Sequence, residues 1–156
     1  MALKPFQEKI IQQLIQQENM LSELYQTFAG QFPTYEKFWK NLSREEKRHA
    51  KLLEKLYVAA TREKIFFDEG KIKTVTLNVF ISRLEDIVKK AKNQEYTLPG
   101  ALTCALDFET SLIEKNIFTH FDSLNDKVKG TLKILQSETM NHVDRVRKAK
   151  VTLSSH

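Results

Sequence analysis

The sequence predicts an all-α protein, a single domain built as a bundle of four helices. Glycine and proline, which interrupt helices, are scarce at 4 and 3 among 156 residues. Apolar residues recur at three- and four-residue steps along four long stretches, which is the pattern of amphipathic helices. A chain of this length is enough for one hydrophobic core, so we expect residues 1–156 to form one domain.

The first two predicted helices follow one another closely. The first covers residues 6–30, and Pro33 ends it. The second covers residues 34–62. Ser43 with Glu46 also has the pattern of a capping box, so the alternative is that a new helix starts at Ser43.

A connector and two more helices make up the rest of the chain. Residues 65–93 begin with a glycine turn and β-branched residues and end in a shorter helix, which we expect to pack along the bundle. The third long helix begins near Pro99, because proline fits a first helical turn, and runs to about Phe121. The fourth follows "DSLND" and continues to the polar ending "TLSSH".

Each of the four long helices carries ionisable residues on or beside its apolar stripe. Successive residues are about 100° apart around a helix, which places an acid of each helix toward the interior. Two histidines share this placement. The residues are Glu18, Glu46, His49, Glu109, Glu138 and His142.

The spacing of these acids predicts one helical hairpin used twice. Glu18 and Glu46 are 28 residues apart, and Glu109 and Glu138 are 29 apart. Two antiparallel hairpins joined by a long crossover form a four-helix bundle. Bundles of this kind bind two metal ions through a Glu from each of two helices and Glu-x-x-His from the other two.

Metal binding would explain why carboxylates converge on an interior. Four buried carboxylates repel one another unless they share a positive charge. Carboxylate and imidazole ligands suit two iron ions, with manganese or zinc as substitutes.

Each residue also has a plain structural interpretation. Glu46 is then only a capping-box acid, and His142 lies at the edge of the core. Glu18 and Glu109 are stripe-edge residues paired with Lys or Arg. Because these interpretations would have to hold independently on four helices, the pattern favours a metal site.

The chain resembles the rubrerythrin-like branch of the ferritin-like superfamily over most of its length. Three motifs carry the resemblance: "ENMLSELYQTFA" with Glu18 and Tyr25, "FWKNLSREEKRHAKLL" with Glu46 and His49, and "ALDFETSL" with Glu109. It implies a ferritin-like bundle with a non-haem di-iron centre. Such proteins are oxidoreductases that reduce peroxide or oxidise ferrous iron.

The resemblance also implies roles for the ligands. Glu46 and Glu138 would bridge the two ions, and Glu18 and Glu109 would each bind one. His49 and His142 would supply one nitrogen apiece. Tyr25 would either hydrogen-bond a ligand carboxylate or serve only as core.

The fourth helix departs from the family pattern. Glu-x-x-His is expected, but "SETMNH" places Asn141 three residues after Glu138 and His142 four residues after it. We expect His142 to be the ligand, because it lies nearer the apolar stripe than Asn141. The alternative is that Thr139 occupies the glutamate position, which leaves one metal site a ligand short.

Two further departures concern redox chemistry. Leu112 stands where rubrerythrins proper carry a second third-helix glutamate that follows the iron as its redox state changes. The sequence holds one cysteine, Cys104, so it has no rubredoxin module, and the electron donor would be a separate protein. Cys104 lies in an apolar run and is expected to be a small buried residue.

Charge and hydropathy limit the partners. The net charge of +5 is spread along the chain among 20 acids, which argues against nucleic-acid binding. The N-terminal segment lacks a signal-peptide core and no apolar run reaches 18 residues, so we expect a soluble, cytoplasmic protein without a membrane partner.

We also expect a homodimer, since helical bundles commonly pair. Two other functions stay open. One is a binding or interaction module that has lost part of its metal site. The other is an iron-storage cage, against which the polar ending argues, because it leaves no room for a fifth cage helix.

Overall fold

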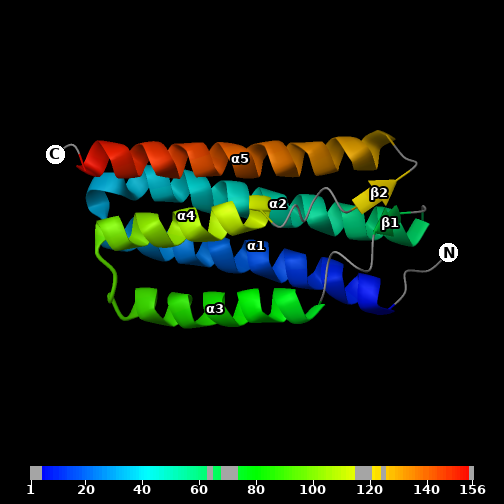
Figure 1. Ribbon diagram of the computed structural model, residues 1–156, viewed down its shortest axis with the longest axis horizontal. Coiled ribbons are helices and arrows are strands. Elements are labelled where there is room, and N and C mark those ends of the chain that lie inside the picture. Colours follow the sequence, from blue (N-terminus) through cyan, green and yellow to red (C-terminus); the bar gives the residue numbers. More distant parts are fainter. Residues whose placement is uncertain (1–4, 63–64, 68–73, 115–120, 124–125, 155–156) are drawn as a thin grey trace.

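The computed structural model describes residues 5–62, 65–67, 74–114, 121–123 and 126–154. These residues form helices apart from one pair of three-residue strands, so the described part of the protein is essentially all-α. In chain order the elements are α1 (Pro5–Gln31), a 3-10 turn (Pro33–Tyr35), α2 (Glu36–Arg62), β1 (Ile65–Phe67), α3 (Thr74–Lys92), α4 (Leu98–Glu114), β2 (Phe121–Ser123) and α5 (Asp126–Ser154) (Figure 1).

Helices α1 and α2 form an antiparallel pair joined by a tight turn at Pro33. Small side chains bring the two helices together near the middle of the pair. The Ser22 hydroxyl donates to the Ser43 carbonyl oxygen at 2.9 Å, and the Ser43 hydroxyl donates to the Ser22 carbonyl oxygen at 2.8 Å. Because Ser43 lies inside a continuous α2, a helix start at this residue is wrong, and Glu46 is not a capping-box acid.

Helix α3 belongs to the connector and lies along α1. The two run in the same direction, since the Gln13 amide donates to Asn78 near their starts and Lys92 pairs with Glu23 at 2.5 Å near their ends. Phe80 and four further apolar residues of α3 enter the main core. The predicted packing of this helix along the bundle is confirmed.

Helices α4 and α5 lie side by side and run in opposite directions (Figure 1). Pro99 is the second residue of α4, as predicted for a proline in a first turn. The predicted end near Phe121 is wrong: α4 ends at Glu114, and Phe121 begins β2, which pairs antiparallel with β1. Ile65 and the two phenylalanines of β1 favour an extended strand. The helical periodicity of the sequence did not predict the pairing of β1 with β2.

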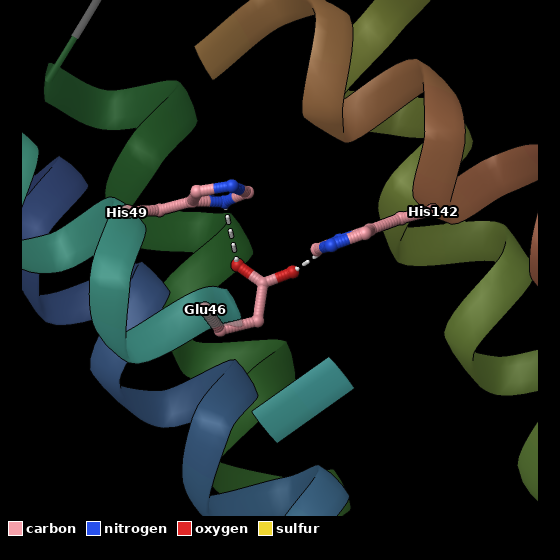
Figure 2. A group of neighbouring side chains, drawn as sticks. All are labelled: Glu46, His49 and His142. Carbon is pink, nitrogen blue, oxygen red and sulfur yellow. Dashed lines mark hydrogen bonds and ion pairs between the residues drawn. The ribbon is translucent and has the colours of Figure 1, made fainter. Parts of the chain in front are cut away.

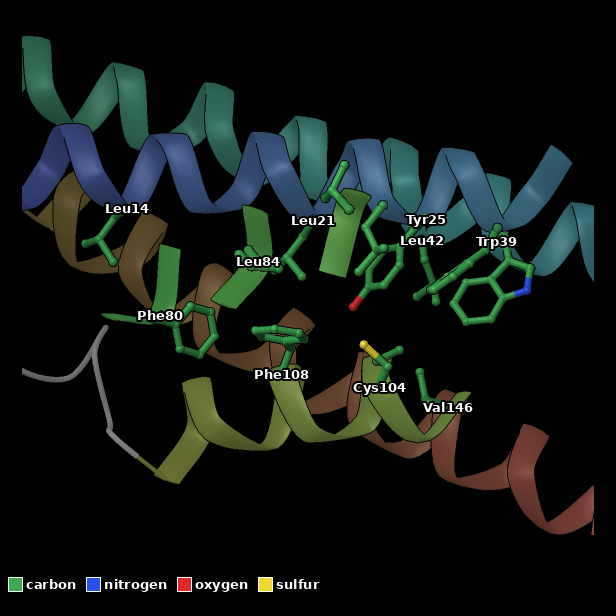
Figure 3. Packing of buried hydrophobic residues seen from close by; sticks show 14 of the residues in the cluster. Leu14, Leu21, Tyr25, Trp39, Leu42, Phe80, Leu84, Cys104, Phe108 and Val146 are labelled. Carbon is green, nitrogen blue, oxygen red and sulfur yellow. The ribbon is translucent and has the colours of Figure 1, made fainter. Parts of the chain in front are cut away.

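The core is continuous and rich in aromatic and aliphatic side chains (Figure 3). Trp39 lies at one end, with its ring centroid 4.9 Å from that of Phe28 and 5.6 Å from that of Tyr25. Cys104 is buried beside these residues, as predicted. Within the described residues, none of the helices is both long and apolar enough to span a membrane.

Candidate metal centre

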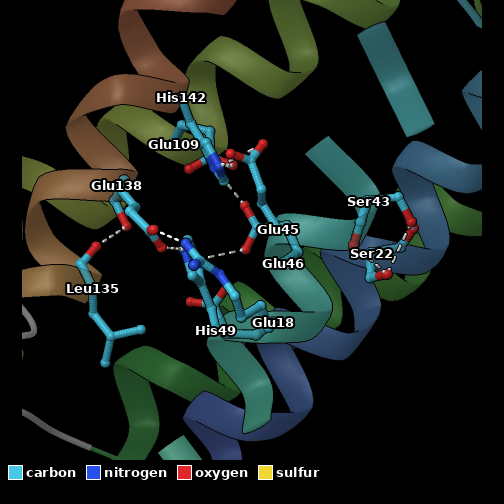
Figure 4. Close-up of polar contacts among 12 residues, drawn as sticks. Glu18, Ser22, Ser43, Glu45, Glu46, His49, Glu109, Leu135, Glu138 and His142 are labelled. Carbon is cyan, nitrogen blue, oxygen red and sulfur yellow. Dashed lines mark hydrogen bonds and ion pairs between the residues drawn. The ribbon is translucent and has the colours of Figure 1, made fainter. Parts of the chain in front are cut away.

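Five of the six predicted ligands are buried together. They come from α1, α2, α4 and α5, and each is exposed by 1% or less (Figure 4). The five are Glu18, Glu46, His49, Glu109 and His142. The sixth, Glu138 on α5, has a side chain that is 25% exposed. The predicted inward placement is confirmed for the five, and metal binding by them stays a prediction.

The carboxylate of Glu46 reaches both imidazole rings, one with each oxygen (Figure 2). Its Oε1 is 2.9 Å from His142 Nδ1, and its Oε2 is 3.4 Å from His49 Nδ1. The rings are stacked, with centroids 5.2 Å apart. One ligand atom from each of the three residues lies within 4.8 Å of the others, so this group could hold a metal ion.

A further buried carboxylate approaches each histidine. Glu18 Oε2 lies 3.9 Å from His49 Nδ1, and Glu109 Oε1 lies 3.4 Å from His142 Nδ1. The Tyr25 hydroxyl donates a hydrogen bond of 2.8 Å to Glu109 Oε1. Tyr25 is therefore both a core residue and a partner of a candidate ligand, which combines the two roles that the sequence left open.

Glu138 reaches the centre from its exposed side. Its Oε2 is 2.7 Å from His49 Nε2, and its Oε1 pairs with Arg48. This carboxylate thus contacts a histidine of α2 rather than His142 of its own helix.

Glu45 is a site residue that the sequence analysis missed. Its Oε2 lies 3.6 Å from His142 Nε2 and pairs with Arg145 at 2.5 Å. A signal was present in the sequence, because Glu45 precedes His49 by four residues, as Glu138 precedes His142. Glu45 lies about 100° around the helix from Glu46, so the phase of the apolar stripe does not select it.

The register of α5 separates His142 from its neighbours. His142 is fully buried, whereas Asn141 is exposed, so the choice of His142 as the inward residue is confirmed. Thr139, one turn before His142, is also buried, and its hydroxyl donates to the Leu135 carbonyl oxygen at 2.8 Å. Thr139 therefore faces inward on α5, three residues before His142, and its hydroxyl is already bonded within its own helix. The side chain of Leu112 lies outside the described residues.

Both histidines have raised pKa values in the metal-free protein. Burial alone lowers the pKa of His49, but the nearby carboxylates of Glu18 and Glu46 outweigh it and raise this pKa to about 9. Burial likewise opposes the charge on His142, whose pKa rises to about 12 because Glu109, Glu45 and Glu46 surround it. The surrounding carboxylates thus favour the protonated form of both imidazoles.

The carboxylates of the site differ in the direction of their pKa shifts. Burial, followed by the charge of Glu46, raises the pKa of Glu18 well above its usual value. Burial also opposes ionisation of Glu109, but contact with His142 lowers its pKa overall. The nearby imidazole of His142 lowers the pKa of Glu45 to about 2 against the effect of burial, with help from Arg145.

Several buried atoms of these residues have no hydrogen-bond partner in the part of the chain that the structure describes. An unpaired buried polar group costs about 1–3 kcal/mol, so such a cluster is costly unless a ligand occupies it. Oxygen and nitrogen atoms of this kind fit a divalent first-row metal ion. The atoms are both carboxylate oxygens of Glu18, Glu46 Oε2, His49 Nδ1, Glu109 Oε2 and His142 Nε2.

Stability of the metal-free protein is expected to fall as the pH rises from 6.5 to about 9. The folded state keeps protons on His49 and His142 that unfolded histidines, with a pKa near 6.5, release. Because the folded state binds more protons, this stabilisation is complete below pH 6.5 and is lost as the pH rises through the folded pKa values.

Chemical denaturation in the presence of a chelator would measure the effect. A midpoint that stays constant or rises over this pH window would contradict the prediction, and the double variant His49→Gln/His142→Gln should show little pH dependence. Metal affinity should change in the opposite direction, because metal binding requires neutral imidazoles.

Comparison of the chain with protein-family models, curated proteins and solved structures gives no match. The function is therefore inferred from the side chains of this site and from their surroundings.

Proposed function

We propose that this protein is a non-haem di-iron oxidoreductase that acts on peroxide, or on oxygen and ferrous iron, within a ferritin-like four-helix bundle. The observation that carries the proposal is a set of buried side-chain oxygen and nitrogen atoms that converge from four helices and have no hydrogen-bond partner among the described residues. The directions of α1, α2, α4 and α5 in Figure 1 agree with two antiparallel pairs joined by a long crossover.

The ligands would divide into two sets around Glu46. Its two oxygens face different histidines, which is what a bridging carboxylate requires. Glu18 lies on the His49 side and Glu109 on the His142 side. Each ion would then have one terminal carboxylate, one imidazole and a share of Glu46. Glu138 contacts His49 and Arg48, which supports a role on one side of the centre more than a bridging role.

The donor set suits iron. Carboxylates stabilise the higher charge of the ferric ion, and imidazoles suit the ferrous ion, so a mixed set accommodates both. Bound iron would supply one-electron chemistry toward peroxide or oxygen, which none of these side chains provides. Manganese and zinc accept the same ligands.

The surrounding residues would keep the site rigid and partly dry. Tyr25 holds Glu109 through its hydroxyl, and burial of the aromatic core beside it excludes water from that end. Glu45 and Glu138 have side chains that are 31% and 25% exposed, so a small substrate would reach the site from their side. The sequence has a single cysteine, so electrons would come from a separate donor protein.

Anaerobic titration with ferrous iron tests the proposal. The protein should bind about two irons per chain and should then consume hydrogen peroxide. Glu18→Ala should bind less iron than the parent, whereas Glu54→Ala, a change at an exposed acid on α2, should not. Absence of iron binding by the parent would refute the proposal.

The second candidate is a ferritin-like bundle that serves as a binding module without a full metal centre. Thr139 favours it, because it places a hydroxyl where the family pattern requires a carboxylate, and that hydroxyl is already bonded to Leu135. The two imidazolium ions could then compensate the acids permanently. Iron binding below one per chain, together with an unchanged fold, would support this candidate.

A further inference from the structure

Helices α2 and α5 carry matching pairs of residues. Glu45 and His49 are four residues apart on α2, and Glu138 and His142 are four apart on α5. The helices run antiparallel, and each glutamate reaches the histidine of the other helix (Figure 4). Glu138 Oε2 is 2.7 Å from His49 Nε2, and Glu45 Oε2 is 3.6 Å from His142 Nε2.

Each of these two glutamates also pairs with an arginine of the opposite helix. Glu138 pairs with Arg48 of α2, and Glu45 pairs with Arg145 of α5. The outer part of the site is therefore built twice, with a pseudo-twofold relation between α2 and α5. This repetition indicates that the outer glutamates have a role in the site.

The two ring nitrogens of His49 have different surroundings. Nε2 is hydrogen-bonded to Glu138, whose side chain is 25% exposed. Nδ1 faces the interior, 3.4 Å from Glu46 Oε2 and 3.9 Å from Glu18 Oε2, and has no hydrogen-bond partner among the described residues. A histidine ligand binds its metal ion through one nitrogen, and the hydrogen bond of the other nitrogen decides which one. The donor atom that His49 offers to an ion is therefore Nδ1.

The ring of His142 is turned the same way. Its Nδ1 lies 2.9 Å from Glu46 and 3.4 Å from Glu109, and its Nε2 faces Glu45 on the other side of the ring. The 3.6 Å between Nε2 and Glu45 is too long for a good hydrogen bond. Of the two outer glutamates, Glu138 is thus the one that already holds its histidine.

We propose that Glu138 is a positioning residue and not a metal ligand: it accepts a hydrogen bond from His49 Nε2 and so keeps Nδ1 of that ring turned toward the ion. This inference rests on the proposed metal centre. It replaces the bridging role that the family resemblance implies for Glu138. The ligand set stays complete, because each ion keeps one terminal carboxylate, one imidazole and a share of Glu46. Arg48 holds the Glu138 carboxylate on the side away from His49.

The alternative is that the ion binds His49 through Nε2 and that Glu138 is its ligand. Two ligands that each lie about 2.1 Å from one ion are about 3–3.5 Å apart. The 2.7 Å between Nε2 and Glu138 Oε2 is shorter than this and is typical of a hydrogen bond. An ion at Nε2 would also lie across the ring from Glu18 and Glu46, the carboxylates nearest to Nδ1.

Nitrogen NMR of the full chain loaded with Zn²⁺ tests the inference, because zinc accepts these ligands and is diamagnetic. The signals of the His49 ring are identified by their loss in His49→Gln. In the parent, Nδ1 of this ring should be bonded to the metal and Nε2 should carry a proton. A metal-bonded Nε2 would overturn the proposal.

Two substitutions of Glu138 separate positioning from coordination. Glu138→Ala removes the acceptor, and loss of such a partner typically costs 10- to 100-fold, so one of the two ions should bind more weakly by about this factor. The Nε2 proton of His49 should also exchange faster with water. Glu138→Gln keeps an acceptor oxygen and should recover most of the affinity, whereas a neutral amide would not replace a carboxylate ligand. Asp144→Ala, at an exposed acid of the same helix, is the control and should bind like the parent.

The remaining outcomes also decide. If Glu138→Gln loses as much affinity as Glu138→Ala, Glu138 acts as a ligand and the inference is wrong. If Glu138→Ala binds both ions like the parent, the inference is again wrong while the metal centre stands. If the parent itself binds neither Zn²⁺ nor iron, the proposed function fails and the role of Glu138 fails with it. Thermal unfolding of each metal-free variant would show that its fold is retained.

Discussion

Glu46→Ala is expected to remove high-affinity binding of both metal ions. The two oxygens of this one carboxylate approach both histidines, at 2.9 Å and 3.4 Å. The equivalent position on α5 is Thr139, so α5 offers no inner carboxylate that could substitute for Glu46. Loss of a residue that hydrogen-bonds a metal ligand typically lowers metal affinity 10- to 100-fold. Loss of a ligand shared by two ions should therefore lower the affinity for each ion at least about 100-fold.

Titration of the variant beside its control would measure this effect. Glu54→Ala removes a carboxylate from the exposed face of the same helix and should bind metal like the parent. Glu46→Gln keeps the side-chain volume and removes the charge, so it distinguishes lost coordination from a collapsed cavity. If Glu46→Ala loses one ion and keeps the other at parental affinity, Glu46 does not bridge.

The helices were predictable because their apolar residues repeat with the helical period. The first predicted helix, residues 6–30, differs from α1 by one residue at each end. The predictions were wrong where the spacing of apolar residues carries no information about the structure. Ser43 and Glu46 matched a capping box, but the Ser43 hydroxyl bonds to α1, which only tertiary packing decides. The strand that begins at Phe121 depends on pairing with a segment more than fifty residues away.

The site was predictable to the extent that it lies on helix stripes. The phase of each helix turned five ionisable residues inward, and all five are buried. Phase alone cannot show how far a long side chain reaches from the edge of a stripe. Glu45 and Glu138 both approach the centre from partly exposed positions, and each contacts a histidine of the opposite helix. These cross-helix contacts depend on the antiparallel register of α2 and α5.

His142→Ala is expected to weaken one of the two metal sites at least 10- to 100-fold, whereas Asn141→Ala should have little effect. His142 is fully buried, and its ring nitrogens lie 2.9 Å from Glu46, 3.4 Å from Glu109 and 3.6 Å from Glu45, with one nitrogen lacking a hydrogen-bond partner in the described part of the chain. Asn141 is one residue away and exposed, so its side chain points away from these groups.

His142→Ala and Asn141→Ala make a matched pair, because they remove side chains at adjacent positions of α5. Only His142→Ala changes the interior of the protein. Metal titrations should show one weakened site and one near-parental site in His142→Ala, since the His49 side keeps its own carboxylate, Glu18. The metal-free His142→Ala protein should also lose part of its pH-dependent stability, because it lacks the imidazole whose pKa is raised to about 12. Equal affinities of His142→Ala and the parent, or a larger loss in Asn141→Ala, would show that α5 contributes a different ligand and that the two metal sites are not built on the paired histidines.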